Sequence, residues 1–254
     1  MHNCLSVIHY EYKMQIKNPA AWGLLLAAAA IALLDNFPNK GNLARLEFLP
    51  DPVYFVYRTM SLDGLIMSFG LLFLLSNRIP LDLKTGVKSL MTASPLSKGQ
   101  YLSGKLFGGF LYTFTMLALF LTLNTFVYFA AAPFSVSIAD CLVPLIKTIF
   151  ISALPISIFI GFTAVALPAL MDIRLFYLSA SVLFIVNASS VNSAESMPFY
   201  LITSGDLIKL IWRHPKWPSV SIYSIFMNLL FLLGVGLLSW AALFFWKKLW
   251  REDT

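Results

Sequence analysis

The sequence has 254 residues, of which 59% are hydrophobic and 12% are charged, and its mean hydropathy is +0.78. Soluble domains contain about 45–50% apolar and about 25% charged residues, so this composition excludes a soluble globular protein. The net charge of +6 fits basic residues gathered in the cytoplasmic loops of a membrane protein and does not favour a nucleic-acid partner.

The first 18 residues predict an amphipathic helix that lies in the membrane interface. Its apolar face consists of four side chains at helical spacing, namely Leu5, Ile8, Tyr12 and Ile16. This face is expected to contact membrane lipid. The alternative is a solvated N-terminal tail, which would expose the same apolar stripe to water.

Six apolar runs predict six membrane-spanning helices, and therefore an all-α membrane protein with one transmembrane domain over residues 1–254. The predicted spans are Pro19–Leu34, Ser61–Ser76, Leu102–Ala131, Leu142–Leu167, Ile173–Val191 and Val220–Trp246. The first two are short for a bilayer. Pro144 and Pro155 are expected to kink the fourth.

The distribution of basic residues predicts the orientation of the spans. With both termini in the cytoplasm, eleven of the 18 lysines and arginines fall on the inner side and seven on the outer side. This bias agrees with the positive-inside rule for a multi-pass protein, here expected in the plasma membrane. Residues 79–101 then form a cytoplasmic segment, and residues 192–219 form an extracellular segment.

Motifs for catalysis or metal binding are not evident in the sequence. Gly99–Lys105 reads G-x-x-x-x-G-K, but the next residue is Leu106, and a phosphate-binding loop needs a Ser or Thr there to hold magnesium. The three histidines do not have the spacing of a metal site. We therefore expect no catalytic residue and no metal ligand in this chain.

Four residues near the predicted spans are candidates for a structural or a functional role. Asp63 is expected in the first turn of the second span, where an acidic side chain complements the helix dipole. Lys147 lies near the outer end of the fourth span, so it either extends to the headgroups or lines a substrate pathway. Gly104 and Gly108 form a small-xxx-small step that favours close helix packing.

The segment RIPLDLKTGVKSLMTASPLSKGQYLSGKL, Arg78–Leu106, resembles the cytoplasmic segment of ABC-2 type transporter permeases. The similar phrases are Lys84–Gly86, LMTASPLS at Leu90–Ser97 and YLSGK at Tyr101–Lys105. The N-terminal amphipathic helix and the order of the six spans are similar to that family as well. The resemblance therefore covers nearly the whole chain.

The resemblance implies the permease subunit of an ATP-driven exporter. Two permease chains, as a homodimer or a heterodimer, would form the pathway, and a separate ABC ATPase subunit would bind ATP and magnesium. The chain itself is then not an enzyme and binds no cofactor. The ATPase contact would be a coupling helix between the second and third spans, formed by Leu83, Lys84, Thr85, Gly86, Val87, Lys88, Ser89, Leu90 and Met91. The alternative for these residues is a solvated basic loop that faces anionic lipid.

The sequence leaves the cargo and two other functions open. Apolar spans that contain Asn124, Asn187 and Asn228 favour an amphipathic peptide, antibiotic or lipid-like cargo over an ion. A self-contained secondary transporter or channel is one alternative, and it predicts paired charges inside the membrane or an inverted repeat. A membrane anchor or sensor that has the permease fold but does not transport is the other.

Overall fold

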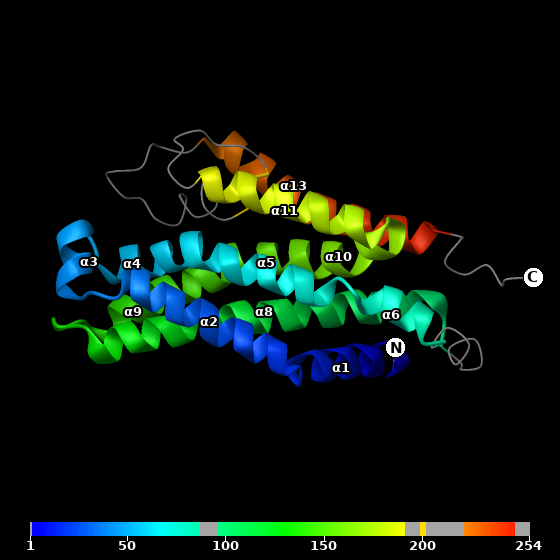
Figure 1. Ribbon diagram of the computed structural model, residues 1–254, viewed down its shortest axis with the longest axis horizontal. Coiled ribbons are helices and arrows are strands. Elements are labelled where there is room, and N and C mark those ends of the chain that lie inside the picture. The colour runs from blue at the N-terminus through cyan, green and yellow to red at the C-terminus, as the bar shows by residue number, and fades with distance from the viewer. Residues whose placement is uncertain (1, 87–95, 191–198, 202–220, 247–254) are drawn as a thin grey trace, which may run out of the picture.

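The computed structural model describes residues 2–86, 96–190, 199–201 and 221–246. Every regular element in these residues is a helix, and the helices pack into one elongated bundle (Figure 1). Five of the described helices are long and apolar enough to cross a membrane. The chain is therefore an all-helical, multi-pass membrane protein.

The first half of the chain forms α1 (His2–Ile16), α2 (Pro19–Asn36), α3 (Lys40–Arg45), α4 (Pro52–Arg58), the π-helical segment η1 (Thr59–Asp63), α5 (Gly64–Leu75) and α6 (Arg78–Lys84). The second half forms α8 (Lys98–Ala131), α9 (Ile138–Thr148), the π-helical segment η2 (Ile149–Ala153), α10 (Leu154–Leu170), α11 (Ile173–Ser189) and α13 (Ile222–Phe245). Two helical stretches of 33 residues each contain a π-helical segment, namely Pro52–Lys84, which has a turn at Ser76 and Asn77, and Ile138–Leu170.

The observed helices correct the second predicted span and leave the fifth unconfirmed. The second span begins at Pro52 instead of Ser61, because Asp51 caps it and accepts a hydrogen bond from the Val53 amide at 2.9 Å. It is therefore long and not short. The fifth predicted span corresponds to α11, whose 17 residues extend only about 26 Å, somewhat less than a typical hydrocarbon core of about 30 Å.

The two prolines of the fourth span flank a change in helix type. Pro144 lies inside α9, Pro155 lies in the first turn of α10, and the π-helical segment η2 separates them. Proline has no amide hydrogen to donate to the carbonyl one turn earlier, and a π-helical turn is one way for the backbone to adjust. The regular α-helix is thus interrupted where the prolines predict a disturbance.

The core of the bundle is built around α8 and α10, which approach each other closely at glycines. A methyl group at Gly161 of α10 would lie 2.6 Å from both the amide nitrogen and Cα of Phe110 in α8. A methyl group at Gly109 would lie 3.1 Å from Cγ2 of Val165. Small residues at such positions let helices pack backbone to backbone in a membrane.

The bundle has two distinct ends (Figure 1). The first residues of α1, α6, the start of α8 and the end of α13 lie at one end, which we call the connector end. The beginning of α4 and α3 lie at the opposite end, which we call the α3 end. The predicted cytoplasmic segment therefore begins at the same end as the described parts of both chain termini.

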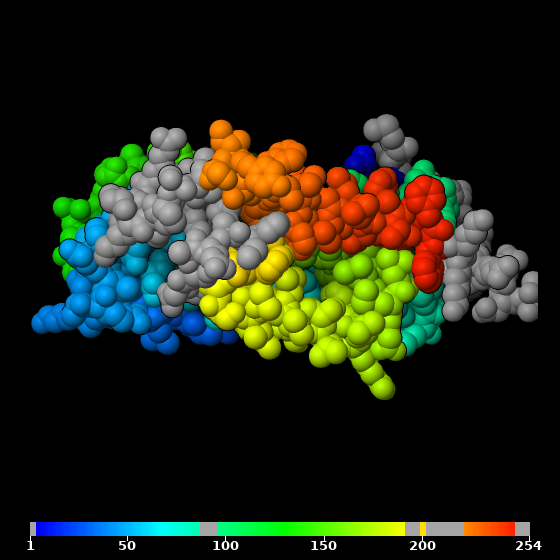
Figure 2. Space-filling model, turned by 90° about the horizontal axis from the view of Figure 1, so that it is seen from above, coloured from blue at the N-terminus to red at the C-terminus, as the bar shows by residue number. Residues whose placement is uncertain are grey.

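The last two helices, α11 and α13, lie on the same face of the bundle (Figure 2). Residues 199–201 run between them and are the only described part of the predicted segment 192–219. The Leu201 amide donates to Asn187 at 2.6 Å, and Asn228 donates to the Tyr200 carbonyl at 2.9 Å. Asn187 and Asn228 thus bind the backbone of residues 200 and 201. This is a structural role, whereas the sequence analysis considered these asparagines only as a sign of the type of cargo.

Candidate functional site

Five charged or polar side chains from α1, α6 and α8 meet at the connector end. We call this group the connector network, and its members are Glu11, Arg78, Asp82, Tyr101 and Lys105. Glu11 is 1% exposed and Lys105 is 6% exposed. Charges this deeply buried are stable only when they are paired, and here two acidic and two basic groups balance.

Lys105 is the centre of the network. Its Nζ lies 2.7 Å from Oε2 of Glu11 and 2.7 Å from Oδ2 of Asp82. The Tyr101 hydroxyl, one turn earlier on α8, donates to the same oxygen of Asp82. The first and last residues of the YLSGK phrase therefore face α6 together, because residues four apart share one side of a helix.

Glu11 attaches α1 to the same place. It accepts hydrogen bonds from Arg78 Nε at 2.9 Å and from Gln15 Nε2 at 3.0 Å, in addition to its ion pair with Lys105. Gly104 and Gly108 make room for α1, since a methyl group there would lie 2.5 Å from Val7 and 2.7 Å from Glu11. The prediction that these glycines permit close helix packing is confirmed.

The residues predicted for the coupling helix are only partly described. Leu83 and Lys84 end α6 with exposed side chains, and Thr85 follows as the cap residue. Gly86 has a φ of 73°, in the left-handed region where an α-helix ends. The described backbone is therefore not one continuous helix from Leu83 through Gly86, and Val87, Lys88, Ser89, Leu90 and Met91 lie outside the described residues.

A helix forms at the predicted place as α1, but it runs along the long axis of the bundle beside α8 (Figure 1), and its apolar stripe is divided. Leu5 is exposed, whereas Ile8, Tyr12 and Ile16 are half-buried, and the Tyr12 hydroxyl donates to Thr115 of α8 at 3.4 Å. The fully buried face of α1 carries Glu11 and Gln15 instead. The helix is thus anchored to α8 through polar groups.

Lys147 lies on the surface of the bundle. Its side chain is exposed in the last turn of α9, beside the exposed apolar side chains of Val143, Ile146 and Phe150. This position allows the ammonium group to extend along the apolar surface towards the headgroups. It does not bring Lys147 into the interior of this chain.

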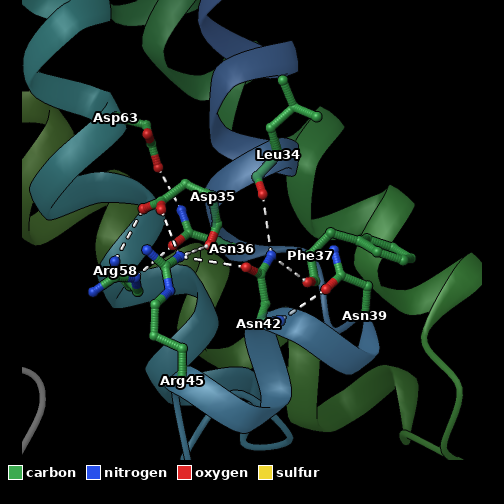
Figure 3. Close-up of polar contacts among 9 residues, drawn as sticks. All are labelled: Leu34, Asp35, Asn36, Phe37, Asn39, Asn42, Arg45, Arg58 and Asp63. Atoms are coloured by element: carbon green, nitrogen blue, oxygen red, sulfur yellow. Dashed lines mark hydrogen bonds and ion pairs between the residues drawn. The ribbon is translucent and has the colours of Figure 1, made fainter.

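A second polar group, near the α3 end, joins α2, α3 and α4 (Figure 3). We call it the α2–α4 cluster, and its members are Asp35, Asn36, Arg45, Arg58 and Asp63. Asp35 pairs with Arg45 at 2.6 Å and with Arg58 at 3.0 Å. Asn36 accepts from Arg58 Nε at 2.5 Å and donates to Asp63 at 2.5 Å.

The place of Asp63 differs from the prediction. Because the helical stretch begins at Pro52, Asp63 lies in its middle, at the end of η1, and not in a first turn. The side chain is 3% exposed, and its hydrogen-bond partner is Asn36. The helix-dipole explanation is therefore wrong. Asp63 is instead a buried acidic group inside a membrane-spanning helix, a type of residue that is generally functional.

Sequence patterns did not identify the partners within either group. The signals that were present are the spacing of Tyr101 and Lys105 and the acidic Glu11 within an otherwise apolar and basic segment. Among the described residues, no three His, Cys, Asp or Glu side chains are placed to hold a metal ion. The connector network is thus the candidate functional site, and its ion pairs and hydrogen bonds hold α1, α6 and α8 together.

Known proteins do not supply an identity for this chain. It matches no protein-family model, no curated protein and no solved structure at a significant level. A function therefore has to be inferred from the membrane-spanning bundle, the connector network and the α2–α4 cluster.

Proposed function

We propose that the chain is the membrane-spanning permease subunit of an ATP-driven ABC exporter. It forms the substrate pathway with a second permease chain, identical or related, and a separate ATPase subunit drives it by binding ATP and magnesium. The cargo is an amphipathic peptide, an antibiotic or a lipid-like molecule. The protein resides in the plasma membrane with both termini in the cytoplasm.

The contact between α6, where the predicted coupling segment begins, and α8 is the observation that supports this proposal most. Tyr101 and Lys105, which begin and end the permease-like phrase, both bind Asp82 of α6. A segment that receives force from a partner subunit has to be attached to the helix that it moves. In addition, Leu81 and Leu83 expose 43% and 41% of their surface on α6, and such exposed apolar side chains suit a protein contact.

The network also suggests how motion would spread through the permease. Closure of two ATPase subunits would displace α6 and, through Asp82, the beginning of α8. Glu11 joins α1 to Lys105 and to Arg78, so α1, α6 and α8 would move as one unit. Rigid-body motion of packed helices is a common means of switching between inward and outward access.

A copurification experiment tests the proposal. The variant Leu83→Glu combined with Val87→Glu is expected to lose the ATPase subunit that copurifies with the native chain. Placing charges at an apolar contact of this kind costs about 2 kcal/mol or more, which corresponds to a loss of affinity of about thirtyfold. The measurement is the amount of ATPase subunit retained by the tagged permease in mild detergent.

The matched control is Leu175→Glu, which places the same charge on an exposed apolar position of α11. It is expected to retain the ATPase subunit. Retention of the subunit by the double variant would contradict the proposed contact, and absence of any ATPase from the native preparation would contradict the function itself. Stimulation of the reconstituted ATPase by cargo then separates an exporter from an anchor or sensor.

A self-contained secondary transporter is a second candidate, because the α2–α4 cluster places charged groups, including the buried Asp63, within membrane-spanning helices. Paired charges inside the membrane are expected of such transporters. The two functions differ in their energy source. Transport by the purified chain alone, driven by an ion gradient and without nucleotide, would favour this second function.

A further inference from the structure

The most informative group outside the connector network is the part of the α2–α4 cluster that surrounds Asn36. The Asn36 side chain is fully buried, and both the oxygen and the nitrogen of its amide form hydrogen bonds. Its oxygen accepts from Arg58, and its nitrogen donates to Asp63 (Figure 3). An amide is suited to this position, because it presents an acceptor to the guanidinium and a donor to the carboxylate.

The charges of the cluster balance only when all four ionic groups are counted. Asp35 pairs with Arg45 and Arg58, so these three side chains together carry one net positive charge. When it is ionised, Asp63 carries the matching negative charge, and it forms no ion pair of its own within the described part of the chain. Arg58 therefore compensates Asp63 indirectly, through Asn36.

The π-helical segment explains how one amide reaches both groups. Arg58 precedes η1 and Asp63 ends it, so the two residues are five apart. In a regular α-helix, residues five apart point in different directions. Hydrogen bonds in a π-helix run from residue i to residue i+5 and bring such residues onto one side. Both side chains can then face α2, where Asn36 is located.

We propose that Arg58, Asn36 and Asp63 form a latch that holds α2 against the junction of α4 and η1 and keeps the α3 end of the bundle closed to water. Separation of α2 from η1 would break both hydrogen bonds of the Asn36 amide and remove the link between Arg58 and Asp63. The closed arrangement is therefore the one that satisfies these groups. The latch is a property of this chain alone and does not depend on a partner subunit.

Accessibility of a cysteine beside the latch tests this proposal. Ser61 lies within η1 and is 4% exposed, so Ser61→Cys provides a probe between Arg58 and Asp63. The probe is introduced after Cys4→Ala and Cys141→Ala, and the full chain is studied in lipid nanodiscs with a charged, membrane-impermeant thiol reagent. Arg58→Gln is expected to increase the labelling rate by about tenfold or more, because it removes the compensation of Asp63.

Three further variants make the result specific. Arg58→Gln combined with Asp63→Asn should label at the native rate, because no uncompensated charge remains. Arg45→Gln should also label at the native rate, because Arg45 pairs with Asp35 at the exposed edge of the cluster, where water can solvate the Asp35 carboxylate, and it does not contact Asn36 or Asp63. A second probe, Ser68→Cys in α5, is fully buried and should stay unlabelled when Arg58 is replaced.

Each outcome decides the proposal. Fast labelling of Ser61→Cys alone, reversed by Asp63→Asn, supports a local latch. A native labelling rate in Arg58→Gln overturns it. Fast labelling of both probes in Arg58→Gln also overturns it, because that result means general unfolding of the bundle and not local opening.

Discussion

Lys105→Met is expected to lower the stability of the chain by about 3–5 kcal/mol, the range for breaking a buried ion pair by removing one partner. The value should fall in the lower part of that range, because Glu11 keeps Arg78 and Asp82 keeps Tyr101. The loss also weakens the attachment of α1 to α8. Two measurements check this prediction. One is the half-life of the folded chain at a fixed temperature in detergent. The other is the rate of tryptic cleavage after Lys13 in α1 and after Lys17, which follows α1; the half-life should fall and the cleavage rate should rise.

The control for this prediction is Lys147→Met. It removes an exposed lysine of a membrane-spanning helix and is expected to change stability by less than about 0.5 kcal/mol. Lys105→Met combined with Asp82→Asn should recover part of the loss, because one of the stranded carboxylates is then neutral. Equal behaviour of Lys105→Met and Lys147→Met would show that the connector network does not hold these helices together.

The positions of most membrane-spanning helices could be predicted because long apolar runs identify them directly. The start of the second span could not. Pro52–Met60 contains Arg58 and several aromatic residues, and a charge in that place is typical of a loop. In the folded chain, Asp35 and Asn36 bind the Arg58 guanidinium, and the helix can therefore begin nine residues earlier than predicted, at Pro52 instead of Ser61. The compensation comes from α2, which local sequence patterns do not show.

The same limit applies to the candidate site. Helical periodicity on α1 predicts an apolar stripe that meets lipid, and it gives no partner for Glu11. In the structure, Glu11 is buried and paired with Arg78. This partner lies 67 residues away in the sequence and approaches Glu11 only when α5 and α6 are in place, so a local pattern cannot predict the pair. Periodicity describes one helix, whereas charge pairing between helices depends on the whole bundle. The glycines of α8 were recognised because small residues at a four-residue spacing are a local signal.

Gly161→Ala is expected to destabilise the bundle by about 1–3 kcal/mol or more, the cost of forcing an extra methyl group into a packed core. The added methyl would lie 2.6 Å from the amide nitrogen and Cα of Phe110 and 3.0 Å from the carbonyl carbon of Gly109. These are backbone atoms, so no side-chain rotation can relieve the contact. The helices α8 and α10 have to move apart, and the edge contact of Phe107 with Phe162 at 5.5 Å should weaken as well. Thermal unfolding in detergent measures the effect.

Gly234→Ala provides a matched control for this substitution, because it makes the same chemical change in another membrane-spanning helix, α13. A methyl group at position 234 meets no atom within 4 Å, so stability should change by less than about 0.5 kcal/mol. Any effect of removing a glycine from a helix as such is common to both variants, and the difference between them isolates the contact between α8 and α10. If the two variants unfold at the same temperature, α8 and α10 do not pack backbone to backbone at Gly161, and the core of the bundle is arranged differently.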